Sequence, residues 1–153
     1  TWKETTEAHR RPEETAWCQS EVFGTKDASG IDDKGVEVRP MTLRKWHRSD
    51  VMTEILDAGA IIVGSPTLNN NIFPTVADML VYMKGLRPQN KLAAAFGSYG
   101  WSGEAVKLIN KEFEAMKLEI MDPGLRIKFV PDNKGLADCF EWGQKIGAAI
   151  VGE

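Results

Sequence analysis

Hydroxyl and amide side chains gather directly after an apolar run at residues 60–64. The segment that carries them reads Ser65, Pro66, Thr67, Leu68, Asn69, Asn70 and Asn71. Hydroxyl and amide groups form hydrogen bonds without carrying charge, which suits the edge of a neutral heteroaromatic ring. A turn rich in Asn that satisfies only its own backbone accounts for the same residues. Taken alone, this segment leaves a ring-binding site and a structural turn open.

A second segment of the same kind follows the apolar run at residues 92–97. It reads Ser98, Tyr99, Gly100, Trp101, Ser102 and Gly103. Its aromatic rings offer flat apolar surface, and its glycines allow backbone amides to approach a ligand closely. The simpler alternative is a pair of core aromatics beside the start of a helix. Because both segments follow strand ends, we interpret them together as the binding site of a flat, aromatic, uncharged ligand.

The elements that must position these segments alternate between strands and helices from residue 35 onward. Strands are expected at residues 36–41, 60–64, 92–97 and 127–130, and helices at 51–56, 76–83, 106–116 and 136–150. Pro40 should end its strand or place it at a sheet edge, and Gly85 should end the second helix. The alternation predicts an α/β fold, an open parallel sheet with helices on both faces. Ligands bind such sheets outside the carboxyl ends of the strands, so segments 65–75 and 97–103 should lie side by side.

Residues 1–34 depart from this regular pattern, because they are rich in charge and show no clean apolar period. We therefore expect a single domain over residues 1–153 whose first 34 residues are atypical or irregular. The chain starts with Thr1 rather than Met, which indicates an excised domain or a chain whose true beginning lies upstream.

Composition and charge argue against several other classes of protein. The net charge of −3 and the pI near 5.5 disfavour a nucleic-acid binder, which needs an excess of Lys and Arg. No apolar run is long enough for a membrane span and the start is not a signal peptide, so we expect a cytoplasmic protein. Two cysteines (Cys18 and Cys139) and two histidines (His9 and His47) are too scattered to indicate a disulfide framework or a metal site. No catalytic motif is found, so no catalytic residue is assigned.

Four segments of the chain together resemble the flavodoxin-like domain of flavodiiron proteins, also called A-type flavoproteins. These segments are Gly64–Asn70, Pro74–Val76, Lys84–Pro88 and Ala94–Glu104. The resemblance runs from about Gly35 to the end of the chain. It implies a flavodoxin-like fold with a parallel five-stranded sheet in the order 2-1-3-4-5, bound FMN, and a role as an electron carrier within an oxidoreductase rather than as a complete catalyst.

Carried over to this sequence, the resemblance assigns cofactor contacts to both polar segments. Pro66, Thr67 and Asn69 would line one side of the isoalloxazine ring, with Ser65 beside them. The other ring-binding loop would consist of Ser98, Tyr99, Gly100, Trp101, Ser102 and Gly103. Either Trp101 or Tyr99 is expected to stack on the ring.

The amino-terminal part of the chain departs from the family pattern. Members open with an apolar first strand, followed by a hydroxyl-rich loop that cradles the FMN phosphate at a helix amino terminus. Thr5 and Thr6 are the candidates for that loop here, although Glu4 stands where a hydroxyl is expected and no strand precedes them. A second candidate is the segment at residues 22–30. The first strand and the phosphate loop therefore stay open.

The resemblance also implies protein partners. These are an electron donor, such as a rubredoxin-like protein or a flavin reductase, and a di-iron domain in cis or from another subunit; a homodimer is possible. Neither nucleic acid nor membrane is expected as a partner. Two other functions stay open from the sequence: a flavodoxin-like NAD(P)H quinone or flavin reductase, and a cofactor-free interaction module.

Overall fold

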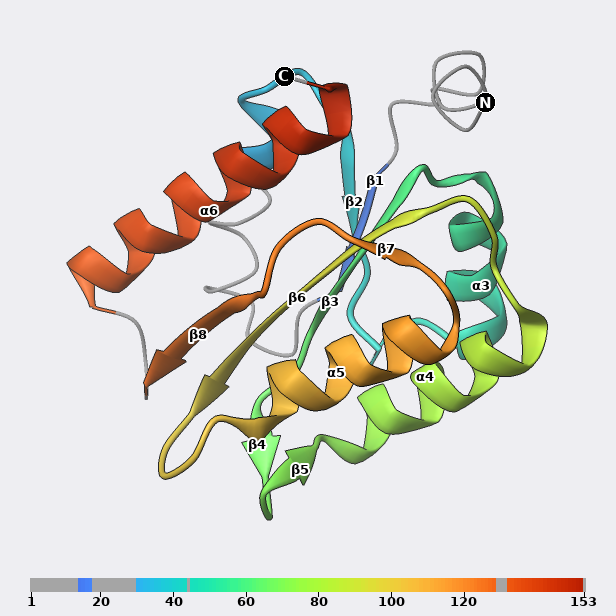
Figure 1. Ribbon diagram of the computed structural model, residues 1–153, viewed down its shortest axis with the longest axis horizontal. Coiled ribbons are helices and arrows are strands. Elements are labelled where there is room, and N and C mark those ends of the chain that lie inside the picture. Colours follow the sequence, from blue (N-terminus) through green and yellow to red (C-terminus); the bar gives the residue numbers. More distant parts are fainter. Residues whose placement is uncertain (1–13, 18–29, 44, 129–131, 153) are drawn as a thin grey trace.

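The computed structural model describes residues 14–17, 30–43, 45–128 and 132–152, the first of these ranges through its backbone (Figure 1). The strands are β1 (Glu14–Trp17), β2 (Val38–Pro40), β3 (Ala60–Gly64), β4 (Thr67–Leu68), β5 (Asn71–Ile72), β6 (Leu92–Tyr99), β7 (Glu119–Ile120) and β8 (Leu125–Lys128). The longer helices are α3 (Arg48–Asp57), α4 (Pro74–Leu86), α5 (Glu104–Ala115) and α6 (Asn133–Val151). Strands and helices alternate along the chain, as the sequence predicts for an α/β fold.

The larger sheet is parallel throughout and has the order β2-β1-β3-β6-β7, with β8 also paired to β6. Strand β7 lies beside the beginning of β6, where Ala93 is opposite Ile120. Strand β8 lies beside its end, where Phe96 is opposite Leu125. The two short strands are thus one interrupted fifth strand. Numbered in this way, the sheet has the order 2-1-3-4-5, which confirms the fold class expected from the sequence.

Strand β1 lies inside the sheet, between β2 and β3, in a segment for which the sequence predicts no regular element. Thr15 is opposite Arg39 of β2 on one side and Ile61 of β3 on the other. The sequence of β1, Glu-Thr-Ala-Trp, has none of the continuous apolar character typical of a central parallel strand. Pairing with its two neighbours defines this strand, so the prediction of an irregular segment is corrected at residues 14–17.

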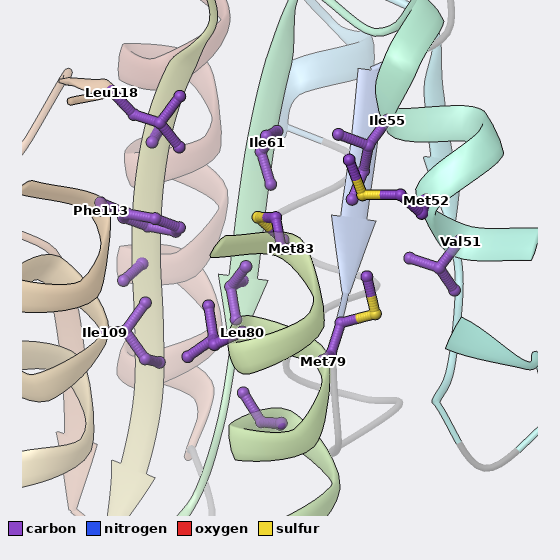
Figure 2. Close-up of a cluster of buried hydrophobic side chains, with 14 of the residues drawn as sticks. Val51, Met52, Ile55, Ile61, Met79, Leu80, Met83, Ile109, Phe113 and Leu118 are labelled. Carbon is purple, nitrogen blue, oxygen red and sulfur yellow. The ribbon is translucent and has the colours of Figure 1, made fainter. Parts of the chain in front are cut away.

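The two faces of the sheet are covered by different helices, as Figure 1 shows. Side chains alternate along β3 and β6, because successive residues of a strand point to opposite faces. One face packs against α3, α4 and α5, and its buried cluster is drawn in Figure 2; its strand residues include Ile61, Val63, Ala93 and Ala95. The other face packs against α6, and its strand residues include Ala60, Ile62, Ala94 and Phe96. Strands β3 and β6 are therefore covered on both faces and support the loops at their carboxyl ends.

Several element boundaries differ from the sequence prediction, among them the end of α4 and the start of β8. Helix α4 continues through Gly85 to Leu86, and Arg87, the residue that follows it, adopts the left-handed conformation (φ 50°) before Pro88. Proline cannot continue the helix, so its position rather than that of the glycine ends α4. The predicted strand at residues 127–130 begins earlier, at Leu125, and residues 129 and 130 lie outside the described ranges. Within those ranges, no helix has both the length and the apolar character needed to cross a membrane.

Asp122 ties the interruption between β7 and β8 to helix α6. Its buried carboxylate accepts hydrogen bonds from Trp142 Nε1 at 3.0 Å, from the backbone N–H of Gly124 at 2.9 Å, and from Lys145 Nζ. Burial by itself would raise the pKa of Asp122, but the hydrogen bonds from Lys145, Trp142 and Gly124 outweigh it and hold the pKa below its ordinary value. This carboxylate therefore fixes the last helix against the sheet in its ionised form.

Candidate functional site

The two polar segments leave neighbouring strands at the same edge of the sheet. The backbone N–H of Ser65 donates to the carbonyl of Phe96 at 3.1 Å. Gly97 lies so close to this contact that an added Cβ would stand 2.4 Å from the Ser65 carbonyl oxygen, a distance that only glycine allows. The expectation that segments 65–75 and 97–103 lie side by side is confirmed.

The first segment is a β-hairpin rather than the polar loop predicted from the sequence. Strands β4 and β5 pair antiparallel, with Leu68 opposite Asn71. Between them, Asn69 and Asn70 both have positive φ, 51° and 58°. Two successive residues of this kind form the tight turn that matches the twist of a hairpin, and Asn tolerates it better than most residues. The Asn-rich run therefore forms a structural turn, one of the two alternatives left open from the sequence. A ligand contact of the exposed Asn69 side chain stays a prediction.

Ser65 holds the base of the hairpin. Its buried hydroxyl donates to the carbonyl of Pro66 at 2.8 Å and accepts from the backbone N–H of Phe73 at 3.0 Å. The bond from Phe73 spans the hairpin, because Phe73 is the residue that leads from β5 into α4. The Ser65 hydroxyl thus helps to position Pro66 and Thr67, the next two residues of the chain.

One hydrogen bond joins the hairpin to the second segment, and another joins it to the start of α5. Ser102 Oγ donates to Asn70 Oδ1 at 2.9 Å, and the backbone N–H of Ala105 donates to Thr67 Oγ1 at 3.3 Å. Asn70 was not among the site residues predicted from the sequence. The two consecutive asparagines, Asn69 and Asn70, are the sequence signal that could have identified it. They form the tight turn at the tip of the hairpin, which is the part that meets the second segment.

Trp101 is 95% exposed, so the alternative that it is a core aromatic is wrong. Leu68, on the adjacent hairpin, is also exposed at 43%. Tyr99 is half-buried and lies against Gly103, where an added Cβ would be 3.2 Å from its ring. Large apolar side chains gathered on an exposed surface are typical of a binding site. The two joined segments therefore present apolar surface edged by uncharged polar groups.

The start of α5 adds hydrogen-bond donors to this site. The first N–H groups of a helix have no partner within the helix. Gly103, the residue before α5, has no side chain to cap them, and Thr67 accepts a hydrogen bond from only one of them, that of Ala105. Arg126 on β8 reaches the same place, since its Nη1 donates to the Gly103 carbonyl at 3.4 Å. Glu104 opens the helix, and its Oε2 is buried without a hydrogen-bond partner among the described residues. Neither Arg126 nor Glu104 was assigned to the site from sequence.

The predicted phosphate-binding residues Thr5 and Thr6 lie outside the described residues, as does the segment at residues 22–29. Both threonines precede β1 in the chain, whereas the segment that follows the carboxyl end of β1 starts at residue 18. A phosphate loop at the sheet edge is expected after the first strand, so the topology favours the second position over the first. Among the described residues, no group of three or more His, Cys, Asp or Glu side chains is arranged to hold a metal ion.

Comparisons with known proteins agree with this architecture. The family model described as Flavodoxin matches residues 15–143. The chain is 42% identical over 139 residues to the nitric oxide reductase of Moorella thermoacetica, an alignment that covers 90% of this chain and 35% of that protein. It spans about a third of the length of the curated relatives it matches.

Solved structures give the same result. Rubredoxin oxygen:oxidoreductase from Desulfovibrio gigas superposes with a TM-score of 0.87 and 37% identity, covering 96% of this chain and 38% of that one. The flavodiiron protein from Giardia intestinalis superposes with a TM-score of 0.88 and 27% identity, covering 97% of this chain and 38% of that one. These relationships imply FMN as the cofactor. Since the family model covers most of the sequence, the chain belongs to the flavodoxin family, and its relatives there are the flavodoxin-like domains of flavodiiron proteins.

Proposed function

We propose that this chain binds FMN between its two joined loops and transfers electrons as the flavodoxin part of a flavodiiron protein. The observation that carries the proposal is a pair of hydrogen bonds beside the exposed Trp101: Ser102 to Asn70 joins the two loops, and Ala105 to Thr67 joins the hairpin to the start of α5. An electron carrier requires a protein that holds the flavin, tunes its potential and exposes an edge to a partner. No acid, base or nucleophile is needed for that task.

The described residues fit the isoalloxazine ring of FMN. Amide and hydroxyl groups of the hairpin, including Thr67 and Asn69, would bind the polar ring edge. Trp101 or Tyr99 would cover a ring face, and Ser98, Gly100 and Ser102 would complete the second ring-binding loop with their backbone and hydroxyl groups. When bound, FMN supplies the redox chemistry, because it accepts electrons in pairs and releases them singly. The sequence prediction gives Thr5 and Thr6 as the residues that would bind the FMN phosphate, whereas the order of elements in the chain favours the segment after β1.

The proposed partners follow from the relatives. One relative is named a rubredoxin-oxygen oxidoreductase and another a nitric oxide reductase. We infer that the electron donor is a rubredoxin-like protein or a flavin reductase, and that a di-iron domain accepts the electrons, in cis or from another subunit of a homodimer. The chain covers only about a third of these relatives, so the acceptor would belong to the remaining part. The cytoplasmic location stays a prediction.

Titration of the purified chain with FMN tests the proposal. We expect saturable one-to-one binding, quenching of the flavin fluorescence, and a shifted visible absorbance spectrum. Riboflavin in place of FMN measures what the phosphate contributes. A chain that is folded by circular dichroism and still binds neither flavin contradicts the proposal and favours the interaction module.

A second measurement distinguishes an electron-carrier function from an NAD(P)H-dependent reductase function. The FMN-loaded chain should accept electrons rapidly from a reduced rubredoxin or through a flavin reductase, and only slowly from NAD(P)H alone. Rapid single-turnover reduction by NAD(P)H without a donor protein would instead support an NAD(P)H-dependent quinone or flavin reductase.

A further inference from the structure

A positively charged side chain lies beside the second loop without being part of it. Arg126 belongs to β8, where it is opposite Gly97 of β6. Its Nη1 is 3.4 Å from the carbonyl oxygen of Gly103, and its Cδ would be 3.3 Å from a Cβ added at Gly103. That added Cβ would also touch the ring of Tyr99. The guanidinium group and the aromatic loop are therefore held together at the start of α5.

Among the described residues, no ion pair neutralises the charge of Arg126. In the part of the chain that the structure describes, the carboxylates that form ion pairs do so with other residues, and none pairs with Arg126. Glu104, the acidic residue at the start of α5, has an oxygen with no hydrogen-bond partner and does not pair with Arg126 either. The amino end of α5 adds partial positive charge of its own. Arg126 thus places beside the second loop a positive charge that no described carboxylate neutralises through an ion pair, and Glu104 places one negative charge at the same helix start.

A fixed positive charge near a flavin acts differently on its two redox states. The oxidised isoalloxazine ring is neutral. Uptake of two electrons from the donor protein and one proton leaves the ring with one negative charge. A cation nearby stabilises that charge and changes the energy of the neutral ring little, so the reduced flavin binds more tightly than the oxidised one. The reduction potential of the bound flavin rises as a result.

We infer that Arg126 sets the reduction potential of the FMN bound at this site, by favouring its reduced form. The inference rests on the proposed FMN binding and deepens it, because it makes the potential of the carrier depend on one exposed side chain of the fifth strand. Arg126 is a positioning residue for the Gly103 carbonyl and, through its charge, a tuning residue for the flavin.

Arg126→Gln, which keeps a polar side chain and removes the charge, tests this inference in the 153-residue chain. We expect the affinity for reduced FMN to fall about tenfold and that for oxidised FMN to change little. A tenfold difference between the two states corresponds to a two-electron midpoint potential lower by about 30 mV. Arg126→Lys keeps the charge and should keep the potential. Lys111→Gln removes the same charge from an exposed position further along α5 and serves as the control.

The outcomes are distinct. If Arg126→Gln weakens the binding of oxidised and reduced FMN equally, the residue only holds the loop, and the inference is overturned. An unchanged reduction potential overturns the inference as well. Should this variant fail to fold, the wild-type potential measured against ionic strength decides, because screening of an exposed charge must lower the potential, and a constant potential overturns the inference. A wild-type chain that binds no FMN overturns the proposed function itself, whereas binding with no effect of Arg126 overturns only this inference.

Discussion

At the scale of single residues, the candidate site combines side chains with two kinds of task. Ser65 and Gly97 have structural tasks, since one holds the hairpin and the other permits the close contact between strand ends. Trp101 is almost fully exposed, so packing within the chain does not explain why a large apolar ring stands at this position. Substitutions at Ser65 or Gly97 should therefore change the stability of the fold, whereas substitution of Trp101 should change ligand binding.

Trp101→Ala should weaken FMN binding without destabilising the fold. An aromatic contact contributes about 0.5–1.5 kcal/mol beyond buried area, so we expect a rise in Kd of about 2- to 10-fold and a shift in the flavin potential. Trp46→Ala removes another exposed indole, one that precedes α3, and should leave both quantities unchanged. Equal affinities for wild type and Trp101→Ala, measured by flavin fluorescence, would remove this residue from the site.

Gly97→Ala should destabilise the protein by about 1–3 kcal/mol, because the new methyl group meets the backbone of Ser65 rather than a movable side chain. Gly85→Ala is the matched control. A Cβ at Gly85 meets nothing within 4 Å, and Ala favours the interior of a helix, so this variant should be more stable by about 0.5–1 kcal/mol. Urea unfolding measures the free energy of unfolding of both variants. Similar midpoints for the two variants would show that the close contact at Gly97 can relax.

At the scale of elements, the β4–β5 hairpin decides how the two loops meet. It is short, and its two turn residues supply both the left-handed backbone and, through Asn70, the bond to Ser102. A hairpin of two-residue strands gains little stability from its own pairing. Its position therefore depends on Ser65 at its base and on the bonds to the second loop at its tip.

Two substitutions at Asn70 should separate the turn from the bond between loops. Asn70→Ala forces a Cβ into the left-handed region and should cost about 1–2 kcal/mol of stability. Asn70→Gly keeps the turn but removes the acceptor for Ser102, so stability should change by less than about 0.5 kcal/mol while FMN binding weakens by about 0.5–1.5 kcal/mol. Chemical unfolding and FMN titration of each variant provide the test. Wild-type FMN affinity in Asn70→Gly would mean that the Ser102 contact does not shape the site.

At the scale of the whole molecule, two apolar layers hold the sheet and one buried carboxylate links the last helix to it. The cluster against α3, α4 and α5 and the cluster against α6 are separate, because alternate residues of β3 and β6 point to opposite faces. Asp122 adds a polar contact to the second layer. Overall stability should accordingly depend on pH through this group.

Asp122→Asn should lower the stability of the chain at neutral pH and reduce its sensitivity to acid. Because the pKa of Asp122 is lower in the folded state than its ordinary value of 3.8, the ionised group contributes stability in full above that value, and the contribution is lost as the pH falls through the folded-state pKa. The variant should be less stable than wild type by about 1–3 kcal/mol at pH 7, with the difference shrinking below about pH 4. Asp138→Asn, at an exposed position of α6, is the control. A difference that stays constant from pH 7 to pH 3 in urea unfolding would contradict the assignment.

The sequence by itself determined the alternation of strands and helices, the parallel sheet, the family and the two segments of the site. Each of these depends on residues close together in the chain, through apolar periodicity or a contiguous motif such as residues 94–104. Gly97 and Trp101 also belong to this group, since both lie within that motif.

Only the tertiary structure decided which residues meet. Strand β1 has no local apolar signal and is defined by pairing with β2 and β3, and Asn70 joins the site by contact with Ser102, 32 residues away. Arg126 reaches Gly103 across 23 residues of sequence. Such contacts depend on the register of strands and the packing of helices, which no local pattern of residues specifies.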